Sequence, residues 1–237
     1  MLEPQGRVIL ISGATRGIGL AVAQVLHTKG YTLSLGARDP AELAPVIKTM
    51  DPGRVMAARY DASEWSCHEQ WVDATVARFG RIDGLVNNAG ISVPMTIRTA
   101  NEKGLDEIWA VNCKAPLNMI RCTLPHLEAT GAGRVINIAS LSGKRVANDH
   151  VAYAMSKFAV MALTHATRQI GWDRGVRACA ICPGFVRTDM TAQVTKVGRA
   201  EMIDPMDLAE LVATVIALPN TASVAELLVN CRWETMV

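Results

Sequence analysis

Tyr153 and Lys157 stand four positions apart in a segment whose apolar residues follow a helical period. Residues at that spacing share one face of a helix, so the phenol and the ammonium can lie side by side. A neighbouring cation stabilises phenolate, and we therefore expect Lys157 to lower the pKa of Tyr153 toward the range useful for proton transfer. Alone, the pair also fits an amphipathic helix with a core tyrosine and a solvated lysine. A second signal is needed to choose between these interpretations.

The second signal is the glycine-rich turn Gly13-Ala14-Thr15-Arg16-Gly17-Ile18-Gly19, which follows the apolar run Val8-Ile9-Leu10-Ile11. Small residues let backbone amides approach a pyrophosphate, and the N-terminus of the next helix attracts its negative charge. The turn would bind the dinucleotide, and the Tyr153–Lys157 pair, which follows it along the chain as expected, would transfer the proton. Together they favour an enzyme that uses a dinucleotide.

Composition limits the other possibilities. The 237 residues suit one α/β domain, and the net charge of +2 is spread without a basic stripe, so we expect no nucleic-acid or membrane partner. No apolar stretch reaches the length of a bilayer span, and no export signal is recognised, which predicts a soluble cytoplasmic protein. The six scattered cysteines are expected to be free thiols and to form no metal site. Strand alternation should direct Cys179 and Cys182 to opposite faces.

Short runs rich in valine, isoleucine and leucine alternate with longer helical patterns. This alternation predicts a single-domain, Rossmann-type α/β fold, a doubly wound parallel sheet of about seven strands with helices on both faces. Strands are expected at 7–12, 31–37, 54–60, 82–86, 134–139, 176–181 and 225–230, and helices at 17–29, 41–50, 64–79, 101–130, 151–173 and 206–217. The irregular stretch 184–204 is expected to be a substrate lid.

In such sheets the ligand crevice lies beyond the carboxyl ends of the strands. Polar or glycine-rich groups follow each of the first six expected strands, and we expect them to face one edge of the sheet. They are the turn 13–19, Arg38, Asp61, the run 87–90, Ser140 and Pro183-Gly184.

These motifs resemble the short-chain dehydrogenase/reductase family over almost the full length of the chain. The resemblance rests on Gly13-x-x-x-Gly17-x-Gly19, Asp61, Asn87-Asn88-Ala89-Gly90, Asn112, Ser140, Tyr153-x-x-x-Lys157 and Pro183-Gly184. It implies a nicotinamide-dependent oxidoreductase that acts on a small-molecule carbonyl or alcohol. It also implies a homodimer or homotetramer packed through its long helices.

The resemblance assigns catalytic roles to four residues. Tyr153 would act as general acid or base on the substrate oxygen, and Ser140 would hold and polarise that oxygen. Lys157 would bond the nicotinamide ribose, and Asn112 would hold a water that links Lys157 to solvent. Ser142 is a competing hydroxyl, but the spacing from Tyr153 favours Ser140. The implied cofactor contacts are Gly13, Thr15, Arg16, Gly17, Ile18, Gly19, Arg38, Asp61, Asn88, Ala89, Gly90, Tyr153, Lys157, Pro183, Gly184, Val186 and Thr188.

The end of the second expected strand indicates which nicotinamide cofactor is used. An NAD site offers a carboxylate there, whereas this strand ends with Ala37 and Arg38, as in the NADPH-preferring carbonyl reductases that the chain resembles. Arg38 and Arg16 would suit a 2′-phosphate, since guanidinium binds phosphate in two-point contacts. Asp39 is the competing acid, but it precedes Pro40 and is expected to start the next helix. We therefore predict NADP(H), and by the same resemblance we expect Asp61 to hydrogen-bond the adenine amino group.

The sequence indicates less about the substrate than about the cofactor. A mostly apolar set is expected to line its pocket, namely Ile91, Val93, Met95, Leu141, Val146, His150, Phe185 and Met190, although most of these also fit the core. Lys144, Arg145, Arg187, Lys196 and Arg199 would favour an anionic substrate unless they are solvated loop charges. The C-terminal sequence departs from the commonest family pattern and leaves open a hydroxy-acid or amino-acid alcohol dehydrogenase. A noncatalytic dinucleotide sensor is the alternative from another functional class.

Overall fold

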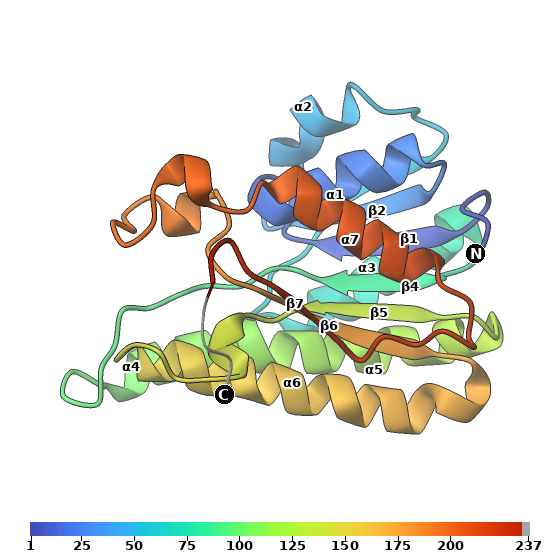
Figure 1. Ribbon diagram of the computed structural model, residues 1–237. Helices are drawn as coiled ribbons and strands as arrows, with labels where there is room; N and C mark the ends of the chain where they lie inside the picture. Colours follow the sequence, from blue (N-terminus) through green and yellow to red (C-terminus); the bar gives the residue numbers. More distant parts are fainter. Residues whose placement is uncertain (234–237) are drawn as a thin grey trace.

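The computed structural model describes residues 1–233 and contains one sheet of seven parallel strands (Figure 1). The sheet order is β3-β2-β1-β4-β5-β6-β7, so the winding direction reverses between β1 and β4. The strands are β1 (Val8–Ser12), β2 (Thr32–Ala37), β3 (Val55–Arg59), β4 (Gly84–Asn87), β5 (Arg134–Ile138), β6 (Arg177–Pro183) and β7 (Glu226–Val229). The predicted doubly wound sheet is confirmed, and the reversal marks the crevice where such folds bind ligands.

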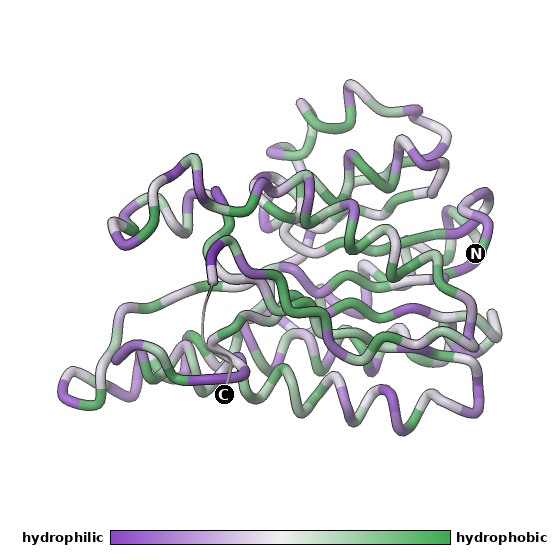
Figure 2. The backbone as a smooth tube through the Cα atoms, viewed as in Figure 1, coloured by the Kyte–Doolittle hydropathy of each residue, from purple (hydrophilic) through white to green (hydrophobic). Residues whose placement is uncertain are grey.

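Helices cover both faces of the sheet (Figure 1). One face carries α1 (Gly17–Thr28), the short α2 (Ala44–Ile47) and α7 (Pro205–Ala217), and the other carries α3 (Trp65–Phe79), α5 (Ala115–Ala129) and α6 (Val151–Gly171). Helix α4 (Glu102–Trp109) leads into α5. In Figure 2 the strands are largely green, that is, hydrophobic. Strands buried on both faces explain why the sequence shows unbroken apolar runs there.

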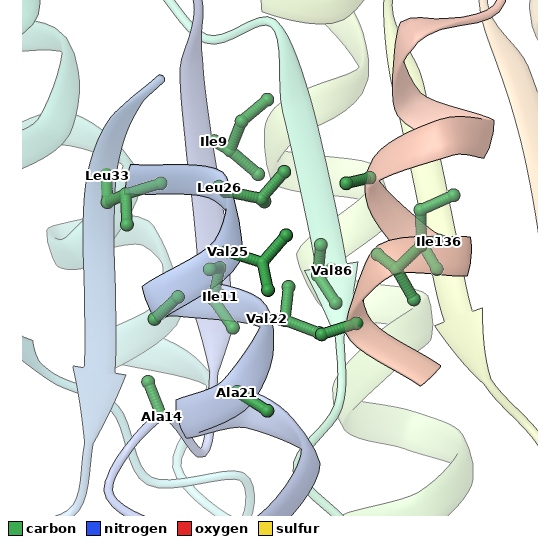
Figure 3. Close-up of a cluster of buried hydrophobic side chains, with 14 of the residues drawn as sticks. Ile9, Ile11, Ala14, Ala21, Val22, Val25, Leu26, Leu33, Val86 and Ile136 are labelled. Atoms are coloured by element: carbon green, nitrogen blue, oxygen red, sulfur yellow. The ribbon is translucent and has the colours of Figure 1, made fainter. Parts of the chain in front are cut away.

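Strand alternation places the two largest core clusters on opposite faces of the sheet. Ile9 and Ile11 of β1 pack against α1, where Val22 and Leu26 meet them (Figure 3). The intervening Leu10 faces α3 and α5. Near the other edge of the sheet, Cys179 and Cys182 fall in different clusters, as their spacing predicts, and all six cysteines are free thiols.

The expected helix at 41–50 is wrong in extent. The chain forms a 3₁₀ turn at Pro40–Leu43 and then only the single turn of α2. Pro40 and Pro45 each stand in the first two positions of their turns and lack an amide hydrogen, which favours short helical starts over a continuous ladder. Asp39 caps the first turn, as predicted, because its side chain accepts a hydrogen bond from the amide of Ala41.

The expected helix at 101–130 is interrupted. A π-helical turn, η2 (Ala110–Lys114), separates α4 from α5, and Asn112 lies at its centre. Pro116 has no amide hydrogen to donate to the carbonyl of Asn112 four residues earlier, so regular α-helical bonding cannot pass this point. The bulge directs the Asn112 side chain into the interior, where it is 2% exposed.

Candidate active site

Ser140, Tyr153 and Lys157 come together where β5 ends against the first turns of α6. Ser140 follows β5 and hydrogen-bonds the Tyr153 phenol. Lys157 donates from Nζ to the carbonyl oxygen of Ile138 at 2.8 Å, and this ammonium lies 5.5 Å from the centre of the Tyr153 ring. Ser142 instead donates its backbone amide to the Ser140 hydroxyl at 3.1 Å. The geometry thus distinguishes the two serines in favour of Ser140.

Burial dominates the electrostatics of this group. Loss of hydration disfavours the charged form of each side chain, so it raises the pKa of Tyr153 and lowers the pKa of Lys157 to about 8. The hydrogen bond from Ser140 pulls the pKa of Tyr153 back toward its ordinary value. The expectation that Lys157 lowers the pKa of Tyr153 is wrong for this structure. The ammonium is itself desolvated, is held by the Ile138 carbonyl and lies over the ring.

Asn112 ties the loop after β4 to α6. Its Oδ1 accepts from the Ile91 amide at 2.9 Å, and its Nδ2 donates to the Ile91 carbonyl at 2.9 Å and to Ser156 Oγ at 3.0 Å. Ser156 Oγ in turn donates to the Tyr153 carbonyl at 2.8 Å. Both Nδ2 hydrogens are therefore occupied by protein, so a water bound by Asn112 must use an oxygen atom. The supporting role of Ser156 was not anticipated from the sequence.

The glycine turn lies against the end of β4, and its glycines Gly13 and Gly19 have no room for a side chain. Gly13 has φ of 68°, and a Cβ there would lie 3.1 Å from Ala89 Cα. A Cβ on Gly19 would lie 2.3 Å from the Gly13 carbonyl oxygen and 2.5 Å from Asn88 Nδ2. Helix α1 begins at Gly17 with no side-chain cap on its first amides. Bare glycines and uncapped amides at a helix N-terminus fit the pyrophosphate of a dinucleotide.

Ser12 and Asn88 clamp this turn in place. Asn88 Nδ2 donates to the carbonyl oxygens of Ser12 at 2.9 Å and Gly13 at 3.0 Å. The Ser12 hydroxyl accepts the amides of Asn88 at 3.0 Å and Ala89 at 3.1 Å. Asn88 and Ala89 therefore hold the turn in addition to any ligand contact. Ser12 was missed by the sequence analysis, and its only signal is a hydroxyl at the end of a buried strand.

Arg38 and Asp61 follow the two outer strands of the same half. Arg38 is exposed just after β2, whereas Asp39 Oδ1 is committed to the Ala41 amide at 2.9 Å. Asp61 follows β3, and its Oδ1 accepts from the amide of Ser63 at 2.9 Å and from its hydroxyl at 2.6 Å. These bonds lower the pKa of Asp61 and leave its second oxygen available.

The segment 184–204, which starts after Pro183 at the end of β6, lies against the glycine turn. A Cβ on Gly17 would lie 3.3 Å from the Thr188 methyl, and Arg16 pairs with Asp189 at 3.1 Å. Val186 turns its side chain into the core, so only its backbone can meet a ligand. The structure thus gathers every predicted cofactor residue along one edge of the sheet. They are Gly13, Thr15, Arg16, Gly17, Ile18, Gly19, Arg38, Asp61, Asn88, Ala89, Gly90, Tyr153, Lys157, Pro183, Gly184, Val186 and Thr188.

The expected substrate-lining set is only partly suited to that role. Ile91 and Val93 pack near Tyr153, but Met95 and Leu141 are buried in core clusters. Several expected surface cations have partners: Lys144 pairs with Glu226, Arg187 with Asp204, and Arg199 donates to the Thr188 carbonyl. Because these partners offset the positive charge, the loops give little support to an anionic substrate.

Comparison with known proteins identifies the family. The family model described as short chain dehydrogenase matches residues 7–197. The chain belongs to the short-chain dehydrogenase/reductase family. It is 46% identical over 233 residues to the agropine synthesis reductase of Rhizobium rhizogenes, a match that covers 98% of this chain and 54% of that protein. The chain therefore spans about half the length of the curated relative it matches.

Two solved structures of this family are similar in fold. One is an alcohol dehydrogenase from the archaeon Thermococcus sibiricus complexed with 5-hydroxy-NADP, with TM-score 0.86, 28% identity, and 94% and 95% of the two chains covered. The other is a 3-ketoacyl-(acyl-carrier-protein) reductase from Brucella melitensis complexed with NADH, with TM-score 0.88, 26% identity, and 96% and 98% covered. Both nicotinamide cofactors thus occur among similar structures.

Two further observations concern residues 1–233 of this family member. None of their helices is long and apolar enough to cross a membrane. Within the same range, no group of three or more His, Cys, Asp or Glu side chains is arranged to hold a metal ion.

Proposed function

We propose that this short-chain dehydrogenase/reductase transfers hydride between NADP(H) and a carbonyl or secondary alcohol, with Tyr153 as general acid and base. The observation that carries the proposal is the contact of Tyr153 with both Ser140 and Lys157 at the edge of the sheet that also holds the glycine turn. A proton donor, a polarising hydroxyl and a dinucleotide cradle at one edge are the parts that carbonyl reduction requires.

The protein's own groups would act on the substrate oxygen. The reduced nicotinamide, when bound, supplies the hydride. Ser140 donates a hydrogen bond to the carbonyl oxygen, where negative charge develops, and Tyr153 gives its proton to the same oxygen. Lys157 bonds the nicotinamide ribose. Asn112 holds the loop after β4 and, through an oxygen atom, the water that returns a proton toward Lys157.

The preference for NADP(H) over NAD(H) is supported by the end of β2. Ala37 offers no carboxylate to a ribose, Asp39 is committed as a helix cap, and Arg38 is exposed beside that position. Arg38 would pair with a 2′-phosphate, and Arg16 would join it by leaving Asp189. The 5-hydroxy-NADP in the Thermococcus sibiricus enzyme agrees with this preference, whereas the NADH in the Brucella melitensis enzyme shows that the fold alone does not decide it.

Reduction of a ketone or aldehyde is the favoured direction, and the name of the Rhizobium rhizogenes relative, a reductase, supports it. Oxidation of a hydroxy acid or an amino-acid alcohol is the enzymatic alternative. A noncatalytic sensor fits less well, because Ser140, Tyr153, Lys157 and Asn112 are all present and placed together.

A homodimer or homotetramer is also proposed. Leu117 of α5, with Met155 and Phe158 of α6, exposes apolar surface on the long helices. Paired copies would bury such surface.

The test is a screen for NADPH oxidation over aldehydes, diketones, keto acids and quinones, followed by kcat/KM for the best acceptor with NADPH and with NADH. We expect turnover with at least one carbonyl compound and a higher kcat/KM with NADPH. A higher kcat/KM with NADH would contradict the cofactor assignment. Cofactor binding without turnover in either direction would favour the sensor.

A further inference from the structure

His68 of α3 is fully buried beneath the loop that follows β3. Its Nε2 lies 2.9 Å from the carbonyl oxygen of Asp61, and its Nδ1 lies 3.0 Å from Nδ2 of Asn118 in α5. The imidazole also stacks on Tyr60, with 4.9 Å between ring centres. A buried ring bonded through both nitrogens is held in one orientation.

The neighbours of His68 determine where its proton resides. Arg121 Nε can only donate, and it lies 2.8 Å from Asn118 Oδ1, so that atom is an acceptor and Nδ2 is the end that faces His68. Nδ2 can only donate, and therefore Nδ1 of His68 accepts. The ring proton is then on Nε2, which donates to the Asp61 carbonyl. Burial lowers the pKa of His68, in agreement with a neutral ring.

The neighbouring Cys67 also bonds the backbone of Asp61. The amide of Asp61 donates to Cys67 Sγ at 3.1 Å, and the thiol lies 3.3 Å from the Asp61 carbonyl. Two consecutive side chains of α3 thus bond both backbone polar groups of Asp61. The Asp61 side chain is held separately by Ser63, through Oδ1. These bonds hold the backbone of Asp61 and one of its carboxylate oxygens, and the second oxygen accepts none of them.

We propose that His68 is a positioning residue for cofactor binding, which aims the Asp61 carboxylate at the adenine amino group of the dinucleotide. The inference rests on the proposed function, since it requires a bound dinucleotide. It goes beyond that function by assigning a role to a buried side chain that touches neither substrate nor cofactor. The bond from Nε2 to the Asp61 carbonyl controls affinity for the adenosine half of the cofactor and leaves the nicotinamide half unaffected.

The experiment compares two substitutions of His68 by residues whose side-chain amides differ in length. In His68→Gln the amide nitrogen can reach the place of Nε2 and donate to Asp61, whereas in His68→Asn it reaches only the place of Nδ1. Dissociation constants are measured by calorimetry for adenosine 2′,5′-bisphosphate, for reduced nicotinamide mononucleotide and for NADPH. Thr75→Val is the matched control, because Thr75 is buried on the same helix but bonds Ser34 and the Trp71 carbonyl instead of the Asp61 loop.

We expect His68→Asn to weaken adenosine 2′,5′-bisphosphate about tenfold, the effect of losing one buried hydrogen bond, and His68→Gln to restore most of that loss. Neither variant should change the affinity for reduced nicotinamide mononucleotide or kcat at saturating NADPH. Thr75→Val should lower the melting temperature without changing either fragment's affinity.

Equal weakening of both fragments by His68→Asn, or failure of His68→Gln to restore binding, would reduce His68 to a structural residue and overturn the proposal. Unchanged adenosine 2′,5′-bisphosphate affinity in a folded His68→Asn would overturn it as well. Binding to the wild-type protein is measured before any variant is compared. A wild-type protein that binds neither fragment nor NADPH would contradict the proposed function itself.

Discussion

The two halves of the proposed site differ in the chemical groups that form them. The nucleotide half, at the ends of β1 to β3, consists mainly of backbone: glycines packed without room for a Cβ and a helix that begins without a side-chain cap. The catalytic half, at the ends of β4 to β6, consists of buried and half-buried polar side chains that bond one another or nearby backbone groups. We therefore expect one carbon atom added to a glycine of the nucleotide half to disturb cofactor binding. In the catalytic half, we expect activity to fall when a side chain changes its chemistry but keeps its volume.

The catalytic half also rests on a buried polar chain. Asn87 Nδ2 donates to Asn137 Oδ1 at 2.9 Å, and Asn137 Nδ2 donates to Thr164 Oγ1 at 2.8 Å. This chain connects β4, β5 and α6 behind Tyr153. These two buried hydrogen bonds tie β4 to β5 and β5 to α6. The glycine turn is held by its close steric fit and by the hydrogen bonds of Ser12 and Asn88.

The largest effect is expected from Gly19→Ala, which breaks the nucleotide half. The new Cβ would lie 2.3 Å from the Gly13 carbonyl oxygen and force the turn to move. NADPH affinity should fall by about tenfold to a hundredfold, from an overpacking penalty of about 1 to 3 kcal/mol, as measured by fluorescence titration.

Gly6→Ala is the matched control for that variant. Gly6 has a positive φ of 75°, which Gly19 does not, and a Cβ there meets nothing within 4 Å. It should reduce stability slightly and leave NADPH affinity unchanged. Equal loss of affinity in both variants would show that the close fit of the turn at Gly19 does not govern binding.

The next effect is expected from Lys157→Met, which changes chemistry in the catalytic half at nearly constant volume. Turnover should fall by about a hundredfold to ten-thousandfold, the usual contribution of a group that assists proton transfer. At pH 7 the variant should be more stable than the wild type, since a buried charge is removed. Urea unfolding and steady-state kinetics measure the two effects.

The stability difference should depend on pH in a definite direction. Burial lowers the pKa of Lys157 to about 8 from an ordinary value of 10.5. Between these values the unfolded wild type binds a proton that the folded protein does not, so the wild type gains stability as pH rises. The advantage of Lys157→Met should therefore shrink from pH 8 to pH 10.5. An advantage that stays constant across this range would contradict the burial of the charge.

The smallest effect is expected from Arg38→Ala, which sharpens the description of the nucleotide half. NADPH affinity should fall about tenfold through loss of one charge-assisted phosphate contact, while NADH affinity stays the same. Arg98→Ala, at another exposed arginine, is the control and should change neither. Equal losses for NADPH and NADH in Arg38→Ala would remove Arg38 from the phosphate site.

The sequence predicted the features of the site that are local patterns and missed those that depend on distant contacts. The glycine turn and the Tyr153–Lys157 spacing are local patterns, and both were found with their elements placed nearly correctly. Ser12 and Ser156 act through partners far away in the chain or across the fold, and a lone serine gives no signal of this. The π-helical turn at Asn112 follows from Pro116 and from packing against α6, which a helical period does not reveal.

The electrostatic expectation failed for a physical reason. Spacing on a helix brings Tyr153 and Lys157 together, but it says nothing about their hydration. In the folded protein, burial raises the pKa of Tyr153, and the opposing contribution comes from Ser140. The sequence thus placed Tyr153 and Lys157 side by side correctly, but it assigned the tuning of the Tyr153 pKa to the wrong neighbour.

The central claim, that the two halves supply binding and proton transfer separately, is tested most directly by Tyr153→Phe. This change removes only the phenolic hydroxyl, so NADPH titration and turnover of the best carbonyl substrate should be measured on the same preparation. The account predicts an unchanged dissociation constant for NADPH together with loss of turnover. Turnover equal to that of the wild type would contradict it.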